Sequence, residues 1–192
     1  MQLLNSFINL VAELADQPGV AALVVLLVLA AVSDLHTYRI PNALTVSGMA
    51  LGLIATTLTA KVPATGFLHA AGGLLTALLC LIPLHALRVM GGGDVKLMAM
   101  VGAFVGVPDI LPALLFVFIA GGVAAVVFAV SRRRVRRLMG NVGDIVRSAA
   151  AGALTGTSPA PAGMVSAGRL PFAIPIGVGT VAFLLYRQAL SA

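Results

Sequence analysis

Long apolar runs separated by short polar breaks dominate the hydrophobic pattern of this chain. A helix of about 20 apolar residues crosses a bilayer, and several runs approach or reach that length. The pattern predicts transmembrane helices at about residues 20–34, 43–60, 67–87, 95–107, 110–130 and 171–186. We therefore expect an all-α polytopic membrane protein with about six transmembrane helices, folded as one membrane-embedded domain over residues 1–192.

Two stretches do not fit the pattern of a membrane span. Residues 1–19 carry apolar side chains at helical spacing with polar residues on the other faces, and they contain no Lys or Arg. This segment resembles an interfacial amino-terminal helix more than a signal peptide, which has a positively charged start. Residues 131–169 open with a run of arginines and continue rich in Gly, Ala, Ser and Pro, which predicts a loop.

The fourth apolar run is unusually short. Residues 95–107 would extend only about 20 Å as a helix, against a hydrocarbon thickness of about 30 Å. If this helix reaches the far surface at Pro108, then Asp94 at its start lies below the near surface. Thinning of the bilayer around the helix is the alternative explanation.

The amino-acid composition is typical of a membrane protein. Of its 192 residues, 60% are apolar and 9% are charged, whereas about 25% would be charged in an average soluble domain. The mean hydropathy is +1.09. The net charge of +6 therefore indicates topology rather than binding of nucleic acid. The single cysteine, Cys80, excludes a disulfide framework and a CxxC zinc site within this chain.

The loop charges predict the orientation of the helices. With the first helix running inward, ten of the 12 Lys and Arg residues fall on the inner side, and only Lys61 and Arg187 stay outside. An excess of positive charge marks cytoplasmic loops. We therefore expect the 131–169 loop in the cytoplasm, and both Asp34 and Asp94 at the cytoplasmic ends of their helices.

Two acids on one side of the membrane indicate a specific chemistry. Asp34 and Asp94 are two of only six carboxylates, and if their side chains meet, one would hold a proton while the other activates a water. Such a pair hydrolyses peptide bonds. Because Asp34 follows a helix and faces the negative end of its dipole, we expect it to hold the proton and Asp94 to act as the base.

Each acid also has a structural explanation. A carboxylate near a helix end reaches the interface at low cost, so either acid alone is compatible with a boundary residue. Asp94 follows three glycines, which are poor helix formers and permit positive φ or close backbone approach. We expect it to follow a turn, where it is also suited to capping the next helix. Asn42 is the expected cap of the helix over 43–60.

The residues around the two acids resemble a known family. The segment from Asp34 through Ile40-Pro41-Asn42 and the segment Gly91-Gly92-Gly93-Asp94-Val95-Lys96 are similar to the paired signature of type IV prepilin peptidases, which are GxGD intramembrane aspartyl proteases. The segment 170–177 is similar to the proline and aromatic stretch that opens the last helix in that family. The short chain is most similar to the peptidases of Tad/Flp-type pilus systems.

The resemblance implies an aspartic-type endopeptidase of the bacterial inner membrane that cleaves the leader peptide of prepilin or pseudopilin precursors on the cytoplasmic side. Asp34 and Asp94 would be catalytic. Gly91, Gly92 and Gly93 are expected to bind the extended substrate backbone, and Lys96 to contact the substrate or mark the membrane boundary. No metal or cofactor is expected. Methyltransferase activity is not expected, because the cysteine-containing insert of bifunctional members is missing.

Two other classes of function compete with hydrolysis. A small ion-coupled transporter could use the acids as proton carriers, but such proteins are commonly built from repeats and this chain shows none. A structural subunit of a pilus or secretion assembly would leave two acids on the same side without a role. Proton flux in vesicles would favour the transporter, and processing of a precursor would favour the peptidase.

Overall fold

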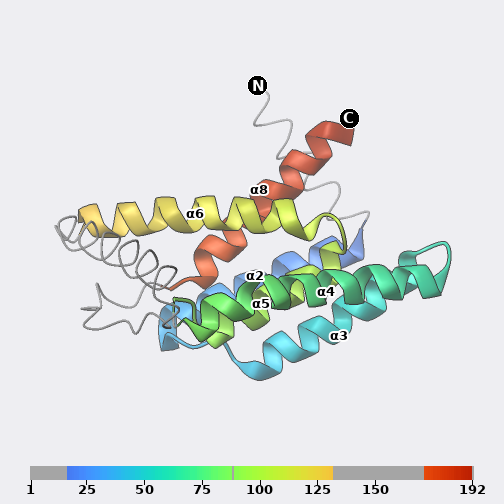
Figure 1. Cartoon of the computed structure of the whole chain (residues 1–192), viewed down its shortest axis with the longest axis horizontal. Coiled ribbons are helices and arrows are strands. Elements are labelled where there is room, and N and C mark those ends of the chain that lie inside the picture. The colour runs from blue at the N-terminus through green and yellow to red at the C-terminus, as the bar shows by residue number, and fades with distance from the viewer. Residues whose placement is uncertain (1–16, 88, 132–170, 192) are drawn as a thin grey trace, which may run out of the picture. The chain divides into compact units, whose positions relative to one another are not determined.

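The computed structural model of this protein describes residues 17–87, 89–131 and 171–191. The described helices are α2 (Pro18–Thr37), α3 (Asn42–Thr59), α4 (Pro63–Ala86), α5 (Gly92–Val105), α6 (Ile110–Ser131) and α8 (Ala173–Ser191) (Figure 1). The predictions of an interfacial segment over 1–19 and of a loop over 131–169 lie almost wholly outside the described residues. Where the two overlap, Pro18 already opens α2, because proline suits the first turn of a helix.

The all-α membrane class is confirmed. Among the described residues, five helices are long and apolar enough to cross a membrane, namely α2, α3, α4, α6 and α8. The sixth expected span, α5, has 14 residues and a length of about 21 Å, which is too short for that role. The described part of the chain therefore contains five helices that are long enough to span and one short helix.

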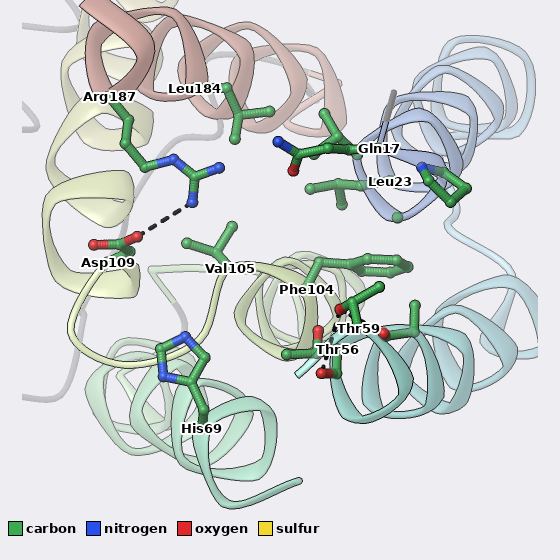
Figure 2. A pocket seen from close by; sticks show the side chains of 14 residues that line it. Gln17, Leu23, Thr56, Thr59, His69, Phe104, Val105, Asp109, Leu184 and Arg187 are labelled. Atoms are coloured by element: carbon green, nitrogen blue, oxygen red, sulfur yellow. Dashed lines mark hydrogen bonds and ion pairs between the residues drawn. The ribbon is translucent and has the colours of Figure 1, made fainter. Parts of the chain in front are cut away.

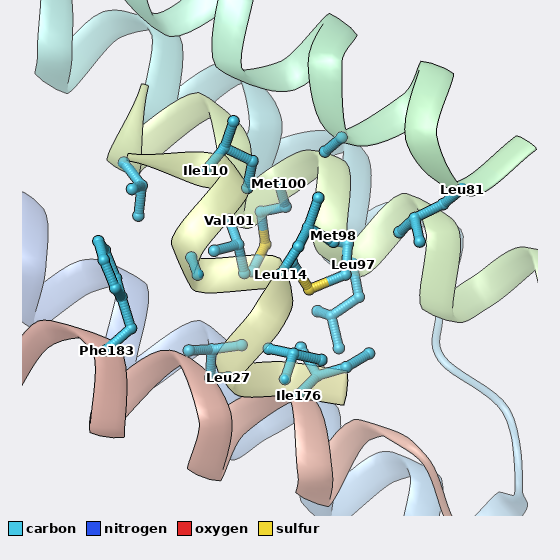
Figure 3. Close-up of a cluster of buried hydrophobic side chains, with 14 of the residues drawn as sticks. Leu27, Leu81, Leu97, Met98, Met100, Val101, Ile110, Leu114, Ile176 and Phe183 are labelled. Carbon is cyan, nitrogen blue, oxygen red and sulfur yellow. The ribbon is translucent and has the colours of Figure 1, made fainter. Parts of the chain in front are cut away.

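The short helix α5 forms the centre of the bundle. Figure 1 shows it running beside α4, and it also contacts α2, α3 and α8. Its side chains from Leu97 to Val101 are fully buried. Figure 3 shows Met98, Met100 and Val101 of α5 within the apolar core. An apolar segment of this length is typical of a buried core helix, in agreement with its central position in the bundle.

Glycines bring the neighbouring helices close to α5. A Cβ on Gly73 of α4 would overlap the carbonyl oxygen of Gly102 of α5, and a Cβ on Gly102 would overlap the carbonyl of Gly73. On the other side, a Cβ on Gly52 of α3 would lie 2.9 Å from the Cβ of Ala103. Small residues at such crossings allow backbone contact, which is the usual way that membrane helices associate.

Contacts divide the chain into two compact units. The described residues up to Gly121 and from Pro171 onward belong to one unit, which contains α2 to α5, the start of α6, and α8. From Gly122 onward, α6 belongs to the other unit. All the contacts discussed below lie within the first unit. That residues 1–192 form one domain stays a prediction.

Candidate functional site

Asp34 lies in the last turn of α2 and its side chain is buried, with 7% of the residue exposed. The helix ends at Thr37, and Tyr38 closes it in the left-handed conformation with φ of 51°. The backbone N–H of Tyr38 donates to the carbonyl oxygen of Asp34 at 2.9 Å. A left-handed residue other than glycine is uncommon and is favoured here because it lets the chain reverse directly after the acid.

The carboxylate of Asp34 is held by the start of α8. The backbone N–H of Ala173 donates to Oδ2 of Asp34 at 3.1 Å. Ala173 is the first residue of α8, so the positive end of that helix faces the acid. This contact fixes the position of the Asp34 carboxyl group between the end of α2 and the start of α8.

The turn after α2 is fixed by hydroxyl groups. The side chains of Ser33 and Thr37 both donate to the carbonyl oxygen of Arg39, at 3.0 and 3.1 Å. These bonds join the last turn of α2 to the backbone that follows it. The turn therefore carries the chain into α3 with the backbone next to Asp34 held in place.

Asn42 does not cap α3, contrary to our expectation. Pro41 occupies the N-cap position and Asn42 is the first residue of the helix. The side-chain oxygen of Asn42 instead accepts a hydrogen bond from Nζ of Lys96 at 2.9 Å. This bond ties the segment that follows Asp34 to the segment that follows Asp94. The prediction that Lys96 contacts the substrate stays a prediction.

The expected turn over the glycines is only partly present. Gly92 and Gly93 form the first turn of α5, and Gly91 is its N-cap with φ of −69°. None of these three glycines has a positive φ. Asp94 is not the cap but the third residue of the helix. Its carboxyl group accepts a backbone hydrogen bond from Gly91. An acid at this position reaches back to the N-cap amide, as in a capping box, which explains how two glycines can open a helix.

The glycines allow close packing on both sides of the loop. A Cβ on Gly91 would lie 2.9 Å from Oδ2 of Asp94, and a Cβ on Gly92 would lie 3.2 Å from the ring of His85. The Nδ1 atom of His85 lies 3.1 Å from the carbonyl oxygen of Met90, in the same loop. Gly91 and Gly92 therefore allow close approach, whereas a Cβ on Gly93 would lie at an ordinary distance of 3.4 Å from Ile40. Whether the three glycines also bind substrate stays a prediction.

The charge of Asp34 acts on the carboxyl group of Asp94. The pKa of Asp94 is raised from its ordinary 3.8 to about 6. Burial is the larger cause and the charge of Asp34 the smaller one, while the hydrogen bond from Gly91 acts in the opposite direction. Asp94 lies in the first turn of the one described helix that is too short to span. The raised pKa favours Asp94 as the protonated member, whereas the helix dipole of α2 led us to expect the proton on Asp34. Which of the two acids holds the proton stays a prediction.

A separate polar cavity lies at the opposite end of the helices. It has a volume of about 340 Å³ and is lined where α2, α4 and α6 begin and where α3, α5 and α8 end. Figure 2 shows His69, Asp109 and Arg187 around it, with an ion pair of 3.2 Å between Asp109 and Arg187. Because Asp34 ends α2 and Asp94 begins α5, this cavity does not include the acids.

Within the described residues, no three His, Cys, Asp or Glu side chains come together in a group that could hold a metal ion. Two contributors to the site were not predicted from the sequence. The amide of Ala173 has no side-chain signal, although Pro171, two residues before it, marks the start of a helix. His85 lies in the last turn of α4, and no local pattern indicates its packing against the glycine loop.

The chain was also compared with known proteins. The model of the type IV leader peptidase family matches residues 21–129, which is more than half of the chain and includes both Asp34 and Asp94. The chain belongs to the type IV leader peptidase family. No curated protein and no solved structure matches it. This membership supports peptidase activity in a multi-pass membrane protein, with prepilin-type precursors as the substrate class.

Proposed function

We propose that this member of the type IV leader peptidase family is an aspartyl endopeptidase of the bacterial inner membrane, which removes the leader of Flp-type prepilins on the cytoplasmic side. The observation that carries the proposal is the pairing of Asp34 and Asp94. They come from different helices, and the charge of one acts on the carboxyl group of the other. Both lie within the residues matched by the family model.

The environments of the two acids suggest different roles. Asp34 accepts a hydrogen bond from the amide of Ala173, which orients its carboxyl group, and we assign it the role of the general base. Asp94, with its raised pKa, acts as the general acid. Two neighbouring carboxyl groups that share one proton are the arrangement that aspartic proteases use.

In the first step, Asp34 takes a proton from water while the water oxygen bonds to the scissile carbonyl carbon. Asp94 gives its proton to the carbonyl oxygen, which produces a neutral tetrahedral diol. In the second step, Asp34 passes its proton to the amide nitrogen and Asp94 recovers a proton from the diol. The C–N bond breaks, and both acids return to their starting forms.

Two observations favour hydrolysis over the competing functions. Membership of a peptidase family supports cleavage of a peptide bond rather than ion transport or a purely structural role. Moreover, the protein fixes the two acids in unlike surroundings, one bonded to a helix amide and one partly desolvated. Such a difference is what a base and an acid of one reaction require.

Co-expression with a short Flp-type precursor tests the proposal. The wild type should shorten the precursor, and Asp34→Asn and Asp94→Asn should not, at equal levels in the membrane. Asp109→Asn is the matched control, because Asp109 lies at the other end of the bundle and should not affect processing. Processing by both active-site variants would refute the proposal, as would loss of processing by the control alone.

A further inference from the structure

An apolar groove lies between α2 and α8. It has a volume of about 430 Å³. Its lining comes from ten residues, all of them apolar or glycine: Val24, Leu27, Val28, Ala31, Ile174, Gly177, Val178, Val181, Ala182 and Leu185. Both helices have the length and hydropathy of membrane spans, so the groove opens within the membrane-embedded part of the protein.

One end of this groove lies about one helical turn from Asp34. Ala31 is three residues before Asp34 on α2. Ile174 directly follows Ala173, whose amide donates to Asp34. From Ala31, the groove continues along α2 to Val24, over about 10 Å. It therefore leads away from the neighbourhood of the buried acid along the helix.

We propose that this groove binds the apolar helix that follows the scissile bond of the precursor, an inference that rests on the proposed function. A bond cut beside Asp34 leaves its leader on one side, and the apolar segment after it must pass into the membrane. The groove begins about one helical turn from that acid, at Ala31, and runs away from it along α2. Its apolar lining offers no hydrogen-bonding partner, as suits a helix whose backbone is already satisfied.

Small residues give the groove its depth. Ala31, Gly177 and Ala182 leave space where larger side chains would fill it. Helices associate in membranes mainly through such close packing, because lipid offers no hydrophobic driving force between them. The same surface is less suited to specific binding of a single acyl chain. Binding of an acyl chain would not require a groove that extends along α2 toward Asp34.

Two glycines on α8 show that the groove can be filled without disturbing the bundle. A Cβ on Gly177 would meet only the Cβ of Leu27, at an ordinary distance of 4.0 Å. A Cβ on Gly179 would instead overlap the backbone of Val117 in α6. Gly177→Leu should therefore occupy the groove and leave the packing of α8 intact, whereas a side chain at position 179 would disrupt it.

The test uses the full-length protein in lipid nanodiscs with a full-length Flp-type precursor. Gly177→Leu should lower kcat/KM at least tenfold, mainly through a higher KM. The control Ala50→Leu, at an exposed position on α3, should leave it unchanged. Failure of the wild type to cleave would refute the proposed function itself. Cleavage by the wild type with equal kcat/KM for Gly177→Leu would overturn only the docking inference.

A cross-linking experiment covers the case in which Gly177→Leu does not fold. Val178→Cys, in a Cys80→Ser and Asp94→Asn background, should form a disulfide with a cysteine placed in the apolar segment of the precursor. Val178 lines the groove and is 58% exposed. Val46→Cys on α3, also 58% exposed, is the matched control and should not cross-link. Equal yields at both positions, or none at Val178→Cys, would mean that lipid fills the groove and would overturn the inference.

Discussion

Cleavage should lose activity as the pH rises above 6. In the proposed mechanism Asp94 donates a proton, so only its protonated form is active. With a pKa of about 6, half of the Asp94 side chains are protonated at pH 6, and about 1% at pH 8. We therefore expect kcat/KM to fall about 50-fold between pH 6 and pH 8, with a slope that approaches tenfold per pH unit.

The assay needs conditions under which only Asp94 titrates. Nanodiscs of uncharged lipid at constant ionic strength keep the pH at the surface equal to that in bulk, since anionic lipid would concentrate protons. The precursor should carry no titratable group near the cleavage site in this range. Asp109→Asn should show the same profile as the wild type, because its acid lies outside the site. A kcat/KM that stays constant or rises from pH 6 to pH 8 would refute the assignment of Asp94 as the proton donor.

The same assignment can be checked without catalysis. Asp34→Asn removes a charge that raises the pKa of Asp94, so that pKa should fall below 6 in the variant. It should remain above 3.8, because burial is the larger cause and is unchanged. Carboxyl ¹³C chemical shifts of labelled aspartate would measure it. An unchanged or higher value would mean that the two acids do not interact.

Two further predictions concern stability and can be measured by unfolding in detergent. Gly73→Ala should lower the free energy of unfolding by about 1–3 kcal/mol, because its Cβ would overlap a carbonyl of α5. A Cβ at Gly122 would have no neighbour within 4 Å, so Gly122→Ala should leave the free energy of unfolding unchanged. Equal effects would contradict the close packing of α4 and α5. One hydrogen bond of 2.9 Å joins Lys96 to Asn42, so each of the variants Lys96→Ala and Asn42→Ala should lower the free energy of unfolding by about 1 kcal/mol or less. The double variant should lose no more than the larger of the two single losses. Additive losses would contradict that bond.

The helices and the shared side of the two acids could be predicted from sequence, because long apolar runs have few structural alternatives and loop charge is counted directly. The nature of α5 was harder to predict. The sequence does not show that α3 and α4 pack closely against α5 through their glycines, which is what buries this helix at the centre of the bundle. The start of α5 was also missed, because two glycines favour a turn unless an acid such as Asp94 stabilises the first amides.

The roles of the acids depended on contacts that no local pattern records. The amide that holds Asp34 belongs to a residue 139 positions away in sequence, and a backbone N–H carries no side-chain signature. The bond between Asn42 and Lys96 joins residues 54 positions apart. Motif residues of this kind could be recognised as important from the sequence, but their partners required the fold.

The most direct test of the central claim is the rate of precursor cleavage by purified Asp34→Asn, Asp94→Asn and the double variant. If the two acids act as one catalytic unit, each single variant should lower kcat by about 10³-fold or more, and the double variant should lower it no further. Circular dichroism and the unfolding midpoint should match those of the wild type. Retention of more than a tenth of the wild-type kcat in either single variant, or losses that multiply in the double variant, would contradict the claim.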